Sequence, residues 1–111
     1  MKISFDKVKK SVDKIGFSLV SNITIDVGRQ ECCPIAAIIL AENKNLCKDV
    51  IETRFNDHCN VILDKADDKF GVNFVLGFLQ GFDGDSKNKL SHNDLLEGWE
   101  NGRHIRNVWM K

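Results

Sequence analysis

Paired glycines in two stretches with helical spacing constrain the fold of this chain more than any other feature. Residues 77–81 read Gly-Phe-Leu-Gln-Gly and residues 98–102 read Gly-Trp-Glu-Asn-Gly, so both follow the order glycine, aromatic, any residue, amide, glycine. A glycine inside a helix costs about 1 kcal/mol relative to alanine. Four such positions are explained if two helices cross here with their backbones in close approach. The sequence therefore predicts a glycine-lined helix crossing with aromatic side chains beside it.

The composition fits one small globular domain over residues 1–111. Hydrophobic residues make up 42% of the chain and charged residues 29%, which is an ordinary globular balance. A chain of this length has no room for a second core and should bury somewhat over ~60% of the surface that it exposes when unfolded. We expect a mainly α fold, a small single-domain bundle of about five helices with one short strand or hairpin at residues 17–27.

The first part of the chain changes from a helical to a strand period. Apolar residues recur at helical spacing over residues 5–15, with Ser4 placed to cap the helix and Gly16 to end it in the left-handed conformation. Over residues 17–27 apolar and polar side chains alternate, which is typical of a strand. The only candidate partner for that strand is the short apolar run at residues 60–63.

The middle of the chain predicts two further helices. Residues 34–41 begin with a proline suited to a first helical turn and are apolar all round, so we expect this helix to be buried. Apolar residues from Cys47 to Ile62 fall on one face of a third helix, which ends in the charged stretch 64–69.

The last part predicts the two helices of the glycine crossing. The first begins at Asp67 or Asp68 and runs to Gly81. The second starts with Ser91 as N-cap and Asp94 three residues later, a capping-box pattern. Basic residues gather in the second half of this last helix, as its dipole favours.

Charge and apolar patterning disfavour nucleic acid and membrane partners. Sixteen basic and sixteen acidic residues cancel, whereas nucleic-acid binders usually carry net positive charge. The longest apolar stretch, residues 34–41, is far short of the ~20 residues of a membrane span. The N-terminus lacks the apolar region of a secretory signal, so the four cysteines are expected to be reduced thiols in the cytoplasm.

The segment from residue 83 to residue 94 resembles the register of an EF-hand calcium loop. The side chains that would supply oxygen ligands are Asp83, Asp85, Ser91 and Asp94. Lys87 departs from the pattern, because it puts an ammonium at the fifth position, where an oxygen ligand belongs. The alternative is a polar connection between helices in which Ser91 and Asp94 act as a cap.

No pattern of residues predicts catalysis or a resident cofactor. Cys32 and Cys33 precede a helix start, where a thiol can be reactive, but free cysteines more often pack in cores. A zinc site would need Cys47 and the His58-Cys59 pair to converge with them, and a structural role is favoured instead. Catalytic triads, glycine-rich phosphate loops and paired catalytic carboxylates are absent, so the sequence predicts no enzyme.

Three short motifs resemble a scattered group of small bacterial and phage proteins. They are Cys32-Cys33-Pro34-Ile35-Ala36-Ala37, Gly81-Phe82-Asp83-Gly84 and Gly98-x-x-x-Gly102-Arg103. The resemblance covers about the last two-thirds of the chain and implies a helical fold, but it carries no activity onto any residue. In size and compartment the chain is also similar to bacterial toxin-immunity proteins.

These observations favour a non-enzymatic protein-binding domain, most concretely an immunity-type inhibitor of a bacterial toxin domain. An unpaired strand at residues 17–27 could add to a partner's sheet. The side chains expected to meet a basic partner are acidic: Asp57, Asp64, Asp67, Asp68, Asp83 and Asp85. The alternatives are a calcium-binding module that uses the 83–94 loop and a homodimeric structural protein.

Overall fold

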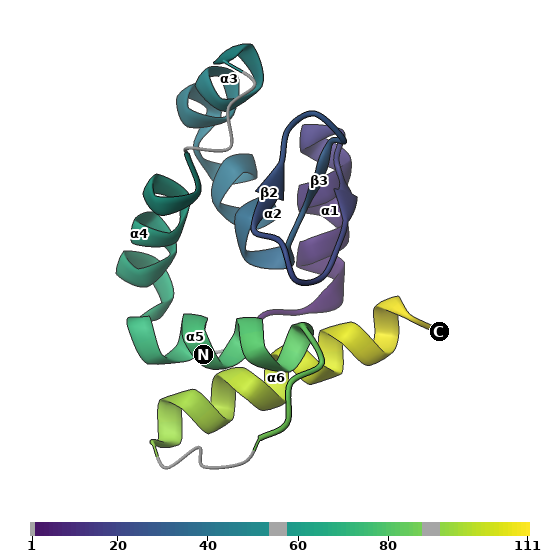
Figure 1. Ribbon diagram of the computed structural model, residues 1–111, viewed down its shortest axis with the longest axis vertical. Helices are drawn as coiled ribbons and strands as arrows, with labels where there is room; N and C mark the ends of the chain where they lie inside the picture. Colours follow the sequence, from purple (N-terminus) through teal and green to yellow (C-terminus); the bar gives the residue numbers. More distant parts are fainter. Residues whose placement is uncertain (1, 54–57, 88–91) are drawn as a thin grey trace. The chain divides into compact units, whose positions relative to one another are not determined.

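The computed structural model describes residues 2–53, 58–87 and 92–111, which are mainly helical, as predicted (Figure 1). The chain divides into two compact units, an N-terminal unit, Asp6–Lys65, and a C-terminal unit, Met1–Phe5 with Ala66–Lys111. A single domain stays a prediction. In chain order the elements are α1 (Phe5–Ile15), β1 (Ser18–Leu19), β2 (Ile25–Asp26), β3 (Glu31–Cys32), α2 (Pro34–Glu42), α3 (Lys44–Thr53), α4 (Cys59–Phe70), α5 (Val72–Phe82) and α6 (Asn93–Trp109).

In the C-terminal unit, α5 and α6 cross with their backbones in contact at the four glycines. A Cβ on Gly77 would lie 2.9 Å from the carbonyl carbon of Leu95 and still nearer to the carbonyl oxygen of Leu95. Gly98 on α6 meets the backbone of α5 in the same way. Only a hydrogen fits in the place of each Cβ, and it points at a carbonyl, as in the weak Cα–H···O contacts of closely packed helices. The predicted glycine-lined crossing is confirmed.

Two arginines of α6 satisfy the carbonyl groups at the end of α5. The last carbonyls of a helix have no partner within it, and the last turn of α5 holds no basic residue of its own. Arg103 Nε donates to the carbonyl of Gly81 at 3.2 Å, and Arg106 Nη1 donates to that of Phe82 at 2.7 Å. These arginines, predicted to complement the dipole of their own helix, therefore cap the neighbouring one.

Asn101 fixes the N-terminal segment to α6. Its side-chain oxygen accepts a hydrogen bond from the backbone N–H of Ile3 at 2.6 Å, and its amide nitrogen donates to the Ile3 carbonyl at 2.8 Å. Both residues are buried. The amide thus pairs with both backbone groups of Ile3, in a place where water could not replace it.

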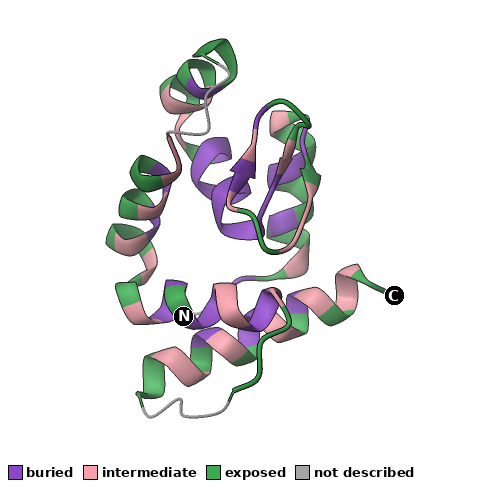
Figure 2. Cartoon of the chain, in the orientation of Figure 1, coloured by how far each residue is buried: buried purple, intermediate pink, exposed green. Residues whose placement is uncertain are grey.

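In the N-terminal unit, α2 is the buried centre. Every residue from Pro34 to Ala41 is buried, as the all-round apolar pattern predicts (Figure 2). Cys33 is the N-cap, since its sulfur accepts a hydrogen bond from the N–H of Ala36 at 3.4 Å. The predicted α1 is also confirmed, and Gly16 follows it with φ +74°.

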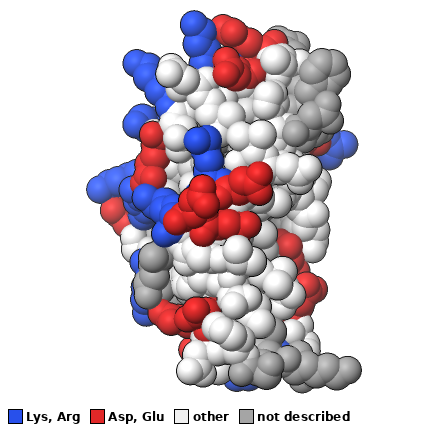
Figure 3. Space-filling model, turned by 90° about the vertical axis from the view of Figure 1, so that its left-hand side faces the viewer, with Lys and Arg blue, Asp and Glu red and all other residues white. Residues whose placement is uncertain are grey.

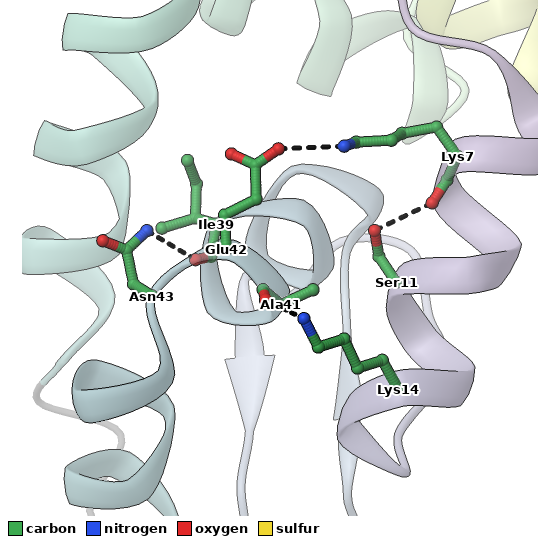
Figure 4. Close-up of polar contacts among 7 residues, drawn as sticks. All are labelled: Lys7, Ser11, Lys14, Ile39, Ala41, Glu42 and Asn43. Atoms are coloured by element: carbon green, nitrogen blue, oxygen red, sulfur yellow. Dashed lines mark hydrogen bonds and ion pairs between the residues drawn. The ribbon is translucent and has the colours of Figure 1, made fainter.

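Polar side chains cover the C-terminal end of α2 (Figure 4). Lys14 of α1 points at this end and donates to the carbonyl of Ala41 at 2.9 Å. Asn43 donates to that of Ile39 at 2.7 Å, and Lys7 forms an ion pair with Glu42 at 2.9 Å. As in α5, the carbonyls of an apolar helix depend on a cation from a neighbouring helix.

The strand prediction at residues 17–27 needs correction. Only β1 and β2 within this range are extended, two residues each, and they do not pair with one another. Both flank β3, which is parallel to β1 and antiparallel to β2, giving the order β1-β3-β2. The proposed partner run at residues 60–63 lies in α4. The alternating pattern continues across a turn where Asn22 has a positive φ of 67°, which interrupts the strand.

Several predicted helix boundaries also differ. The single helix expected from Cys47 to Ile62 is divided between α3 and α4, and residues 54–57 between them lie outside the described ranges. The next helix starts at Val72 rather than at Asp67 or Asp68, because Gly71 has a positive φ of 93° and interrupts the helix.

The N-cap of α6 is His92 rather than Ser91, which lies outside the described ranges. The Nδ1 atom of His92 accepts a hydrogen bond from the N–H of Asp94 at 3.1 Å. Imidazole here takes the acceptor role that the predicted capping box assigns to a hydroxyl.

Substitution of Gly81 or Gly98 by alanine is expected to destabilise the fold by about 2 kcal/mol or more. Alanine favours an isolated helix by about 1 kcal/mol, but its methyl would force the two backbones apart. Urea unfolding measures the loss. Leu76→Ala on the exposed side of α5 is the matched control and should change stability by less than about 0.5 kcal/mol. Equal stability of the glycine variants and the control would contradict the close crossing.

Replacement of Asn101 by alanine is expected to cost about 1–3 kcal/mol, because both backbone groups of Ile3 lose a buried partner. Amide hydrogen exchange at Ile3 should accelerate in the same variant. Asn107→Ala, at an exposed position of the same helix, is the control and should leave both quantities unchanged. Unaltered exchange at Ile3 in the Asn101 variant would show that the pairing does not hold the segment.

Candidate functional site

Helix α4 separates its acidic and basic side chains into two rows. Asp64 and Asp68 are four residues apart and both exposed, with the half-buried Asp67 beside them. Lys65 and Lys69 form the neighbouring row. Figure 3 shows the face of the molecule that carries α4, where acidic groups gather beside basic ones. Within the described part of the chain, none of the three aspartates has an ion-pair partner.

The other predicted acidic residues lie on different segments. Asp57 is outside the described ranges. Asp83 is the half-buried C-cap of α5, and Asp85 follows it in an exposed position. The acidic row of α4, defined here as Asp64, Asp67 and Asp68, is therefore the part of the predicted set that one element holds together.

The carbonyl of Asp85 is already held by side chains of α6. Trp99 Nε1 donates to it at 3.0 Å and Arg103 Nη2 at 2.7 Å. The Arg103 guanidinium also stacks 4.7 Å from the centre of the Trp99 ring, and Lys87 approaches the same ring at 5.6 Å. Two cationic groups thus surround the start of the loop that was considered for calcium.

The remaining calcium candidates give that loop no further support. Asp94 lies in the first turn of α6, and Ser91 is outside the described ranges. Among the described residues, no group of three or more His, Cys, Asp or Glu side chains is arranged to hold a metal ion.

Two cysteines of the N-terminal unit, Cys32 and Cys47, have a thiol pKa above the ordinary value. Burial raises the pKa of the Cys32 thiol far above its ordinary value, and neighbouring Cys33 and Cys47 raise it further. Burial also raises the pKa of Cys47, an effect that the ammonium of Lys14 partly offsets. His58, considered for zinc with Cys59, instead contacts the hydroxyl of Thr53 at 2.9 Å.

A surface groove in the N-terminal unit is the feature that sequence reasoning missed. It has a volume of about 620 Å³ and lies where the end of α1, the end of α2 and one side of α3 meet. We call it the α1–α3 groove, and its lining residues are Lys14, Ile15, Leu40, Ala41, Lys44, Asn45, Cys47, Lys48 and Ile51. They come from three separate segments, so no local pattern in the sequence indicates them.

Comparisons with known proteins add no family to this description. Searches of protein-family models, of curated proteins and of solved structures found no match to this chain. Within the described ranges, no helix combines the length and the apolar character needed to cross a membrane.

Alkylation by iodoacetamide at pH 7 is expected to be slower at Cys47 than in the unfolded chain, and slower again at the fully buried Cys32. A raised pKa means that the folded chain keeps the thiol proton at neutral pH. Burial of the neutral thiol then contributes to the free energy of unfolding. This contribution to the free energy of unfolding is lost as pH rises beyond the ordinary pKa of a thiol. Alkylation should accelerate over the same pH range. Mass spectrometry of peptides after timed labelling at pH 7 and pH 9 measures this. Faster labelling of folded Cys47 at pH 7 would instead indicate an activated thiolate.

Proposed function

We propose that this chain is a non-enzymatic protein-binding domain of the cytoplasm, most concretely an immunity-type inhibitor that binds and neutralises a bacterial toxin domain. The observation that carries the proposal is the acidic row of α4. Asp64 and Asp68 are exposed like charges at i and i+4, an arrangement that destabilises a helix by about 0.2–0.5 kcal/mol. A basic residue in place of either aspartate would stabilise α4. We therefore assign the row to the binding of a basic partner rather than to the stability of the helix.

The expected mode of binding is electrostatic. A row of carboxylates on a helix can approach the basic cleft of a nuclease-type toxin, where complementary charge speeds encounter and selects the partner. Blocking such a cleft requires no chemistry from the inhibitor. Binding of this kind weakens as ionic strength rises, because exposed charges are screened over about 10 Å at 0.1 M salt.

A second contribution is available from the small sheet. Its outer strands, β1 and β2, each pair on one side with β3, and among the described residues no strand pairs with their other side. A partner strand could add to either edge through main-chain hydrogen bonds. Since each strand has only two residues, we assign the main role to the acidic row.

Native mass spectrometry on the untagged protein, isolated gently from its own host, tests the proposal. A second polypeptide in stoichiometric complex is expected, with affinity that falls as salt is raised. A bare monomer at all concentrations would contradict the proposal. A homodimer that forms without another protein would replace it with the structural alternative.

Charge reversal tests which surface is used. The double variant Asp64→Lys/Asp68→Lys should weaken partner binding by about tenfold or more, mainly through slower association. The control, Asp13→Lys/Asp49→Lys, makes the same change in net charge at exposed positions of α1 and α3 and should bind normally. Equal loss in both variants would mean that only net charge matters, and equal binding would exclude the row.

A further inference from the structure

The α1–α3 groove has the size and lining of a site for a small molecule. Its volume of about 620 Å³ falls within the roughly 300–1,000 Å³ of ligand pockets, which are mostly apolar with a few polar groups. Leu40 and Ala41 at the end of α2 are buried and form its apolar base. The half-buried Ile15 of α1 and the exposed Ile51 of α3 add apolar surface above them.

The charged side chains among the described lining residues of the groove have one sign. Among the described residues, three lysines line it and no carboxylate does. The ammonium of Lys14 is held by the Ala41 carbonyl, as Figure 4 shows. Lys44 and Lys48 lie one turn apart on α3. Lys48 forms an ion pair with Glu52 at 4.0 Å, with both side chains mostly exposed, so this pair neutralises little charge.

We propose that the α1–α3 groove binds an anionic amphiphile, a carboxylate with an aliphatic tail. The carboxylate pairs with the ammonium groups of Lys44 and Lys48, and the tail lies along the apolar surface of Ile15 and Ile51. Nine of the described residues line the groove, whereas a stable protein interface takes about 20–30 residues a side, so a small ligand fits it better than a folded partner. This site is independent of the acidic row and carries the opposite charge.

The tail and the head group make separable contributions. Exposed ammonium–carboxylate pairs are weak in water, so the head group mainly selects the sign of the ligand's charge. Removal of the tail from water supplies most of the affinity, at roughly a fourfold gain for each CH₂ that becomes buried. Binding should therefore depend on chain length and on charge in ways that one titration series can separate.

The test is a titration of the ¹⁵N-labelled protein with octanoate, followed by amide chemical shifts. Saturable shifts are expected at residues 14–15, 40–41 and 44–51, and decanoate should bind about fifteenfold more tightly, since it has two further CH₂ groups. Heptyltrimethylammonium, with the same alkyl tail and the opposite charge, should shift these amides far less at the same concentration. Equal shifts with both head groups, or shifts spread over the surface without saturation, would overturn the proposal.

Charge variants locate the head-group site. Lys44→Glu/Lys48→Glu should weaken octanoate binding about tenfold or more, while Lys2→Glu/Lys9→Glu, the same change in charge at exposed positions outside the groove lining, should not. The amide spectra show directly whether each variant is folded. Retained binding in the α3 variant would overturn the proposal. So would groove shifts with an acidic amphipathic peptide but none with octanoate, which would assign the groove to a protein segment.

Discussion

The close approach of α5 and α6 is the interaction on which the C-terminal unit depends. Because only hydrogen stands in the Cβ direction of Gly77, Gly81, Gly98 and Gly102, the two backbones meet with nothing between them. That proximity brings the guanidinium groups of α6 within reach of the last carbonyls of α5. Asn101, between the two glycines of α6, then pairs with the N-terminal segment. The crossing, the caps and the chain terminus thus form one connected arrangement.

In the N-terminal unit, the last carbonyl groups of a helix also need hydrogen-bond partners from outside that helix. An apolar helix such as α2 cannot supply polar partners for its own last carbonyls, and Lys14 and Asn43 provide them from outside. The α1–α3 groove lies at this same end. Its lysines and the acidic row of α4 give the chain two surfaces of opposite charge. Although the net charge of the sequence is zero, acidic and basic side chains are separated locally on the surface. Both the protein-binding and the ligand-binding proposals depend on this separation of charge.

The sequence predicts those parts of the structure that local chemistry determines. The helices at residues 5–15 and 34–41 and the glycine crossing follow from periodicity and from the cost of glycine in a helix. The break at Gly71 was missed because apolar and charged residues continue across it in a helical pattern, whereas the backbone turns to positive φ. The partner of β1 and β2 could not be found, since β3 is two residues long. The groove was missed because its lining comes from three separate segments. The acidic residues of α4 were predicted as partner-binding residues, but their arrangement in one row on a single helix was not.

Nuclear Overhauser effects between glycine Hα protons and the facing backbone test the crossing most directly, because they detect proximity without altering the sequence. The structure predicts cross-helix effects from Gly77 Hα to Leu95, from Gly81 to Trp99, from Gly98 to Phe74 and from Gly102 to Phe78. Effects at all four glycines would establish the backbone contact on which the arrangement of the C-terminal unit depends. Their absence at all four, in a protein whose α5 and α6 are otherwise helical, would contradict it.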